Sequence, residues 1–222
     1  MIDWFPASDG AGSSSVGDDP TAGESALMVN RLVSAVARRH PALAAHSRRV
    51  AVVADALAKR AGWSSTDRAR LREAALLQDV GMMRVSREIT SRRGRLSLVD
   101  WGAVSAHVTA GLTMALDVLD EEQLTWMGEH HERPDGSGYP KGLRDGEISA
   151  GGAILGLADA WSAMTATRAW RGALTAAEAM GQCRERAGSQ FDYTAVSLLE
   201  ELWLNEGNTL PGVSGRSAAL AR

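Results

Sequence analysis

Apolar residues recur at helical spacing along most of the chain, and no segment alternates apolar and polar residues as a half-buried strand does. Residues three and four positions apart lie on one face of a helix, so this spacing gives each helix a face to bury. The pattern predicts an all-α fold built as a single helical bundle. The helices that we expect cover residues 25–39, 42–61, 66–79, 97–117, 121–131, 150–167, 175–187 and 192–203.

Several of the expected helix ends carry their own sequence signals. Pro41 disfavours the helical conformation of His40 and therefore separates the first two helices. Gly62 fits a C-terminal cap. Ser97 and Thr175 are each followed three residues later by an acidic residue, which is the spacing of a capping box.

Four segments lack the helical pattern. Residues 1–24 are rich in Gly, Ser and Asp and predict a flexible acidic leader. Residues 84–95 form an Arg-rich irregular stretch, and residues 132–148 form a loop dense in Gly and Pro. A tail with Gly and Pro covers 206–222, so one domain is expected over residues 25–205.

Charge and composition limit the classes of partner. The 222 residues carry 24 Lys and Arg against 27 Asp and Glu, a net charge of −3, and direct DNA binding is not expected. Residues 1–24 hold five acidic residues and no Lys or Arg, so the rest of the chain carries +2. The single cysteine, Cys183, excludes an internal disulfide and favours a cytoplasmic location. No run approaches the roughly 18 apolar residues that a membrane span needs, so no membrane contact is expected.

The adjacent residues His130 and His131, followed by Glu132, are the first candidates for chemistry. Imidazole suits zinc, iron and manganese, so the pair fits a metal site. The alternative is that the pair only ends a helix, where histidine interacts well with exposed carbonyl groups. The pair by itself leaves both interpretations open.

The run from His130 to Leu143 resembles the signature loop of the HD-GYP family over fourteen consecutive residues. That family is a branch of the HD metal-dependent phosphohydrolases and mostly cleaves cyclic di-GMP. Gly138, Tyr139 and Pro140 match the residues that name the loop, and they are expected to shape the site or a partner surface. The resemblance extends over about residues 26–200 and implies an HD-type bundle with an extended loop.

The resemblance also implies a set of metal ligands. A first metal would contact His46, Asp79 and Asp159, and a second would contact His107, His130 and His131, with Asp79 bridging the two. Two divalent ions, iron or manganese, would share a hydroxide that attacks phosphorus in line. Arg168 and Arg171 match the basic residues that follow the last aspartate, and they join Asp79 and Gln78 as candidate catalytic residues.

The sequence departs from the family at Gln78, Met82 and Ala42, and at Ser162, where many members carry a second aspartate. Gln78 replaces the histidine of the His-Asp pair and offers only a neutral amide oxygen, so we expect the first metal to bind more weakly. Met82 stands where the family has a lysine that meets substrate phosphate. Ala42 replaces an acidic residue of members with three metals, so two ions are expected here rather than three.

Two further groups of residues each allow two interpretations. The arginines within 84–95 form either a solvated basic loop or a phosphate-attracting rim over the site. Trp161 and Trp170 flank the helix end that carries Asp159, and each either packs in the core or lines a wall on which a base stacks.

The expected function is a metal-dependent phosphodiesterase that hydrolyses cyclic di-GMP or a related cyclic dinucleotide to the linear dinucleotide or the mononucleotide. The alternative is a degenerate relative that binds a nucleotide or a protein partner without turnover, and Gln78 and Met82 favour it. Besides the substrate, the expected partners are a diguanylate cyclase or another signalling protein at the Gly-Tyr-Pro loop, and a second copy of the chain in a homodimer.

Overall fold

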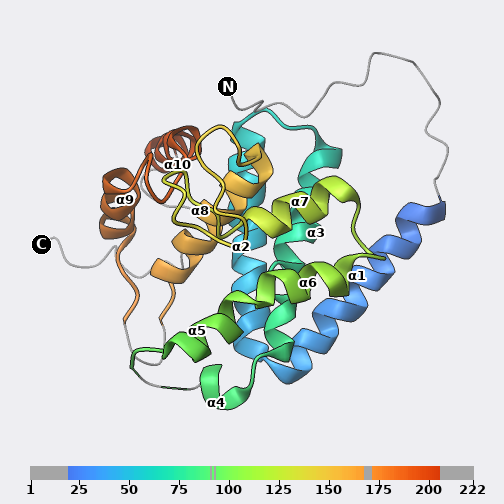
Figure 1. Ribbon diagram of the computed structural model, residues 1–222. Coiled ribbons are helices and arrows are strands. Elements are labelled where there is room, and N and C mark those ends of the chain that lie inside the picture. The colour runs from blue at the N-terminus through green and yellow to red at the C-terminus, as the bar shows by residue number, and fades with distance from the viewer. Residues whose placement is uncertain (1–19, 91, 93, 168–171, 206–222) are drawn as a thin grey trace, which may run out of the picture.

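The computed structural model describes residues 20–90, 92, 94–167 and 172–205 (Figure 1). These residues form helices and connecting loops, with two isolated bridges and no β-strand, so the all-α prediction is confirmed. No helix in the described part of the chain has the length and apolar character to cross a membrane. In chain order the elements are α1 (Pro20–Arg39), α2 (Pro41–Arg60), α3 (Ser65–Leu77), the 3₁₀ helix η1 (Val80–Arg84), α4 (Arg87–Thr90), α5 (Leu98–Ser105), α6 (His107–Ala115), α7 (Glu121–Glu129), α8 (Ala150–Met164), α9 (Ala176–Glu185) and α10 (Tyr193–Asn205).

Helix α2 runs through the middle of the molecule (Figure 1) and packs chiefly against α3 and α8. Val50, Ala54, Leu57 and Ala58 of α2 are fully buried. They lie three, four, seven and eight residues apart, as the apolar face of a helix requires. One face of α2 therefore belongs to the hydrophobic core, and the buried polar residues of this helix, His46 and Ser47, are exceptions to the apolar pattern.

The buried apolar side chains form two clusters. The larger joins α2, α3 and α8 to α9 and α10, and the smaller joins α1, α6 and η1. Along α2, His46 lies between Ala44 of the smaller cluster and Val50 of the larger one. Asp79 likewise follows Leu77 and precedes Val80, both in the smaller cluster. Packed side chains therefore flank both polar positions and hold them in place.

Helix starts follow the sequence signals. Ser97 and Thr175 each accept a hydrogen bond from the backbone amide three residues later, and the acidic residue there completes the predicted capping box. Asp120 and Gln123 form a third capping box at the start of α7. These caps satisfy amides that have no partner within the helix.

The prediction of one helix over residues 97–117 is wrong. The chain breaks at Ala106 into α5 and α6. The carbonyl of Val104, which would accept from Val108 in a continuous helix, lies 2.6 Å from Nδ1 of His107. The apolar pattern continues through the break, so it does not indicate that the ring of His107 contacts this carbonyl oxygen in place of a backbone amide.

Other bounds also differ from those expected. α1 begins at Pro20 rather than near residue 25, η1 precedes the Arg-rich stretch and ends at Arg84, and the stretch itself contains the short helix α4. α7 ends at Glu129, so His130 and His131 follow the helix rather than belong to it. The expected tail, 206–222, lies outside the described residues.

Candidate functional site

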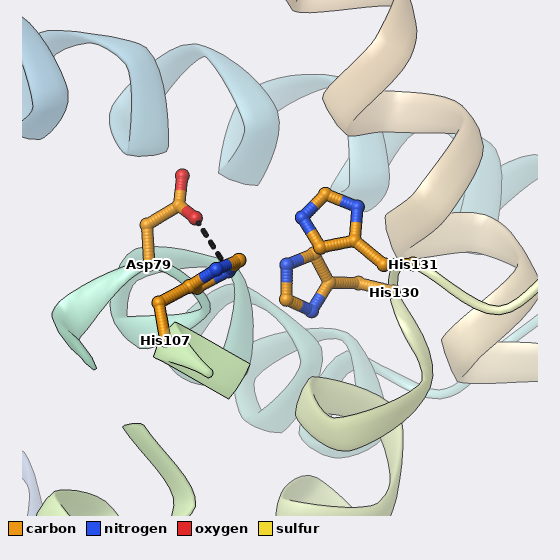
Figure 2. Close-up of side chains that lie close together, drawn as sticks. All are labelled: Asp79, His107, His130 and His131. Atoms are coloured by element: carbon orange, nitrogen blue, oxygen red, sulfur yellow. Dashed lines mark ion pairs between the residues drawn. The ribbon is translucent and has the colours of Figure 1, made fainter. Parts of the chain in front are cut away.

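Six side chains that the sequence singles out as metal ligands come together in the structure. Each of two groups has one ligand atom per residue within 4.8 Å of the others. The first group is His46, Asp79 and Asp159, and the second is Asp79, His107, His130 and His131. Asp79 belongs to both groups, which is the place of a bridging carboxylate. Figure 2 shows the second group, with Asp79 and the three imidazole rings facing one another.

Asp79 reaches His107 because η1 lies directly against α6. A Cβ on Gly81 would stand 2.0 Å from the carbonyl oxygen of His107 and 2.6 Å from the amide nitrogen of Gly111. Only glycine permits that approach. Asp79 Oδ1 is then 3.3 Å from His107 Nε2, the ion pair drawn in Figure 2.

Two buried glutamates hold the histidine pair on either side. Glu129 Oε2 accepts hydrogen bonds from the backbone amide and the hydroxyl of Ser149, which ties the end of α7 to the cap of α8. Gly156 of α8 packs against His130, and a Cβ there would lie 2.8 Å from the His130 carbonyl oxygen. The position of His130 is therefore fixed by two helices.

Glu132 organises the loop that follows the pair. Its Oε1 accepts from the backbone amide of Lys141 at 2.6 Å, and its Oε2 accepts from that of Leu143 at 2.9 Å. A Cβ on Gly138 would stand 2.5 Å from the amide nitrogen of Arg133, so the loop folds back closely on its own start. The sequence did not predict that Glu132 binds two backbone amides of the loop. It indicated Glu132 only as the residue that follows the histidine pair.

Tyr139 lies against His131, one of the candidate metal-binding histidines. Its ring stacks on His131 with centroids 4.8 Å apart and an interplanar angle of 29°. The peptide bond to Pro140 is cis, and Pro140 itself is exposed. Of the predicted loop residues, Gly138 and Tyr139 thus shape the site and Pro140 faces outward. Arg168 and Arg171 lie outside the described residues.

The imidazole rings are oriented for metal binding. His107 Nδ1 and His130 Nδ1 each lie 2.6 Å from a backbone carbonyl oxygen, those of Val104 and Met127. A carbonyl partner fixes the proton on Nδ1 and leaves the Nε2 lone pair free for a cation. The Nε2 atoms of both rings are buried and make no hydrogen bond among the residues that the structure describes, although His107 Nε2 lies 3.3 Å from Asp79 Oδ1. A cation between these atoms would satisfy the nitrogens and the carboxylate together, so they fit a divalent metal ion.

The charge states also suit a cation. Burial lowers the pKa of His131 to about 3 and also lowers the pKa of His130, so both rings are neutral at pH 7. Burial by itself would raise the pKa of Asp79, but contact with His107 brings that pKa well below its usual value, and the same contact raises the pKa of His107 against the effect of burial. An anionic oxygen beside neutral nitrogens is a ligand set for zinc, iron or manganese.

The first group is arranged differently because Gln78 replaces histidine. Gln78 is fully buried, and its Nε2 donates to Asp159 Oδ1 at 3.0 Å. His46 Nε2 lies 2.7 Å from the same oxygen. Gln78 Oε1 is buried without a hydrogen-bond partner in the described structure. Gln78 therefore binds a ligand oxygen that a first metal would use, and this group fits a metal less well than the second.

A cavity of about 860 Å³ opens over the two groups. Asp79, His107, His131 and Asp159 line it, together with Met82. Its basic lining residues are Arg39, Arg49 and Arg87, from α1, α2 and α4. Of the arginines expected within 84–95, Arg87 thus reaches the cavity, while Arg92 pairs with Asp100.

The sequence pattern did not indicate Arg39 and Arg49 as residues of the site. Arg49 lies three residues after His46, on the same face of α2, which was a usable signal. No sequence signal marks Arg39 as a cavity residue, because its position beside the cavity depends on how α1 packs against α4. Arg87 donates to the carbonyl oxygen of Arg39 at 3.0 Å, which joins those two elements.

The tryptophans separate into buried and exposed ones. Trp161 is fully buried, so the core-packing interpretation is confirmed for it, while Trp170 lies outside the described residues. Trp101 is 49% exposed and makes an edge contact with Tyr139 at a centroid distance of 5.5 Å. An aromatic residue near the loop thus exists, but it comes from α5.

Comparisons with known proteins agree with this geometry. A family model described as an HD domain matches residues 31–195. The chain is 34% identical over 183 residues to 3′3′-cGAMP-specific phosphodiesterase 3 of Vibrio cholerae, covering 81% of this chain and 40% of that protein. It is 29% identical over 164 residues to a cyclic di-GMP phosphodiesterase of Thermotoga maritima, covering 71% and 44%. A crystal structure of a cyclic GMP-AMP-specific phosphodiesterase of V. cholerae matches with a TM-score of 0.55 at 30% identity, covering 82% and 41%. The chain thus spans less than half the length of these relatives.

Proposed function

We propose, from the premise that this chain belongs to the HD domain family, that it is a metal-dependent phosphodiesterase acting on a cyclic dinucleotide. The observation that carries the proposal is the convergence of six ligand side chains in two groups that share Asp79. Relatives of this chain are named as cyclic GMP-AMP and cyclic di-GMP phosphodiesterases, which supports the substrate class. The reaction opens one phosphodiester bond, with water supplying a hydroxyl to phosphorus and a proton to the leaving oxygen.

The side chains of the site have distinct tasks in this proposal. His107, His130 and His131 would hold one divalent ion together with Asp79, and His46, Asp79 and Asp159 would hold a second more weakly. Ions bound there would supply Lewis-acid charge at the phosphoryl oxygens and lower the pKa of water. Arg39, Arg49 and Arg87 supply positive charge around the cavity in place of the absent lysine at position 82, and a charged rim attracts an anionic ligand.

The experiment is turnover of two cyclic dinucleotides by the purified chain. The protein loaded with Mn²⁺ or Fe²⁺ is incubated with cyclic di-GMP or 3′3′-cGAMP, and products are separated by anion-exchange chromatography. We expect linear dinucleotide or mononucleotide. Asp79→Asn should remove the activity, whereas Glu201→Gln, an exposed position on α10, serves as a matched carboxylate-to-amide control. Absence of product with either substrate and either metal would refute the proposal.

The second candidate is a signalling module that binds the nucleotide without cleaving it. The specific observation in its favour is the hydrogen bond from Gln78 to Asp159, because it competes with the first metal for a ligand oxygen. Met82 favours it too, since a thioether cannot replace a lysine at phosphate. Tight binding of a cyclic dinucleotide with no product over hours would support this candidate. A protein partner at the Gly-Tyr-Pro loop and a homodimer remain predictions for either candidate.

A further inference from the structure

A second cavity adjoins the one over the metal-ligand groups. Its volume is about 430 Å³, within the range of small-ligand pockets. His131, Tyr139 and Asp159 line both cavities, so they form the boundary between them. A group that occupied the smaller cavity would therefore lie directly beside candidate metal ligands.

A continuous run of aromatic rings leads from the surface to the metal ligands along this boundary. The half-exposed ring of Trp101 contacts Tyr139 edge to face, with an interplanar angle of 80°. Tyr139 stacks on His131, and His131 lies 5.2 Å from His107 between ring centroids. Trp101 lines the smaller cavity, and nothing in the core packing requires an indole at a 49% exposed position.

Polar groups accompany the aromatic ring in the smaller cavity. Arg133 and Gln190 both line it and offer side-chain hydrogen-bond donors, and Gln190 also offers an acceptor. Phe191 adds an apolar surface. The carboxylates of Glu132, Asp159 and Asp192 also line it, so the cavity joins an aromatic and apolar surface to several polar groups, which suits a flat heterocycle.

We infer that the smaller cavity is a subsite for one nucleobase of the dinucleotide, with Trp101 as its stacking residue. The inference rests on the proposed function and assigns a place to a part of the substrate. A base is joined to the scissile phosphate through a single sugar, so a phosphate at the metal-ligand groups brings its base to the adjoining cavity. Stacking on an indole accepts any base, because every base has a π-face. Trp101 is accordingly a binding residue that takes no part in the chemical step.

Equilibrium binding and turnover test this inference together. Cyclic di-GMP is titrated into the metal-free chain by isothermal calorimetry, and KM is measured with the Mn²⁺-loaded chain. The variants are Trp101→Ala, Trp101→Phe and, as a matched control on the same helix, Leu98→Ala, which is 90% exposed and absent from both cavity linings. Circular dichroism and thermal unfolding establish that each variant is folded.

We expect Trp101→Ala to raise Kd and KM about 5- to 150-fold, which corresponds to the ~1–3 kcal/mol of one stacked base. Trp101→Phe should retain most of the affinity because it keeps a ring, and Leu98→Ala should match the unaltered chain. A second readout isolates the base: the ratio of the affinity for GMP to that for ribose 5-phosphate should fall in Trp101→Ala. A general disturbance of the fold would weaken both ligands alike and leave that ratio unchanged.

The outcomes separate the subsite from the catalytic proposal. Turnover with an unchanged KM and an unchanged GMP ratio in Trp101→Ala would overturn the subsite and leave the phosphodiesterase intact. Binding that depends on Trp101, without any turnover, would support the subsite and refute catalysis. No binding of cyclic di-GMP or GMP to the unaltered chain would overturn the subsite.

Discussion

Replacing Gln78 by histidine is expected to strengthen metal binding at the group formed by His46, Asp79 and Asp159. In the unaltered chain, Gln78 Nε2 donates to Asp159 Oδ1 at 3.0 Å, and a metal that uses this oxygen must displace the bond. Gln78→His removes the competing donor and adds an imidazole nitrogen at a fully buried position. The second group, around His107, is not altered.

The size of the effect follows from the displaced hydrogen bond. A hydrogen bond to a charged group contributes about 1.5–3 kcal/mol. Every 1.4 kcal/mol is a tenfold change in affinity, so removal of the bond alone should increase the affinity of the first group for its metal ion about 10- to 150-fold. The added nitrogen ligand increases affinity beyond that. Gln78→Leu, which removes the donor and adds no ligand, separates the two contributions.

The assay is metal titration with a count of bound ions. Mn²⁺ binding is followed by isothermal calorimetry, and the bound metal is counted by inductively coupled plasma mass spectrometry at fixed free Mn²⁺. At a concentration that fills one site of the unaltered chain, Gln78→His should hold two ions per chain. Two ions of equal affinity in the unaltered chain, unchanged by Gln78→His, would refute the reasoning.

Three further predictions concern the scaffold around the site. Gly81→Ala should lower the free energy of unfolding by about 2–3 kcal/mol in urea, because its Cβ would meet the His107 carbonyl oxygen at 2.0 Å; Gly102→Ala, with open space around it, should not. Burial alone would raise the pKa of Asp55, but hydrogen bonds from two arginines lower it, so its stabilisation is present above about pH 4 and is lost as pH falls through the folded-state pKa. Asp55→Asn should therefore cost about 1 kcal/mol at pH 7 and progressively less as the pH falls below about 4 in urea unfolding, and a cost that does not change with pH would contradict this. Glu132→Gln leaves one acceptor oxygen for two backbone amides, so hydrogen exchange should speed up at residue 141 or 143, and unchanged exchange at both would be evidence against the loop tie.

Local sequence signals predicted most of the helical fold. Apolar spacing marks a helix wherever one face is buried, and capping pairs such as Ser97 with Asp100 mark its first turn. Both signals depend on residues a few positions apart. These signals did not predict the break at Ala106. The break involves a contact between the His107 ring and the backbone carbonyl of Val104, and the apolar spacing does not change there.

The site was predictable where the sequence matches the motifs of a known family. The chain has five histidines and 14 aspartates, and the resemblance selected from them all six residues that the structure brings together. Arginine and tryptophan are common on surfaces, and their roles depend on contacts between distant segments. Arg39 and Trp101 became candidates only once α1, α5 and the loop were seen beside the two cavities.

The tie between Glu132 and the loop has a consequence for how this segment can vary in length. The carboxylate reaches the amides of residues nine and eleven positions later, so an insertion between them would lengthen the span that it must close. Glu147 closes a separate small turn with the amide of Arg144, outside that span. The backbone amide of Asp145 donates to the carbonyl oxygen of Pro134 at 3.0 Å, so the loop is tied to its own start on both sides of Leu143. Insertions are therefore expected to be rejected throughout residues 133–147, because each would lengthen a span that a short bond must close.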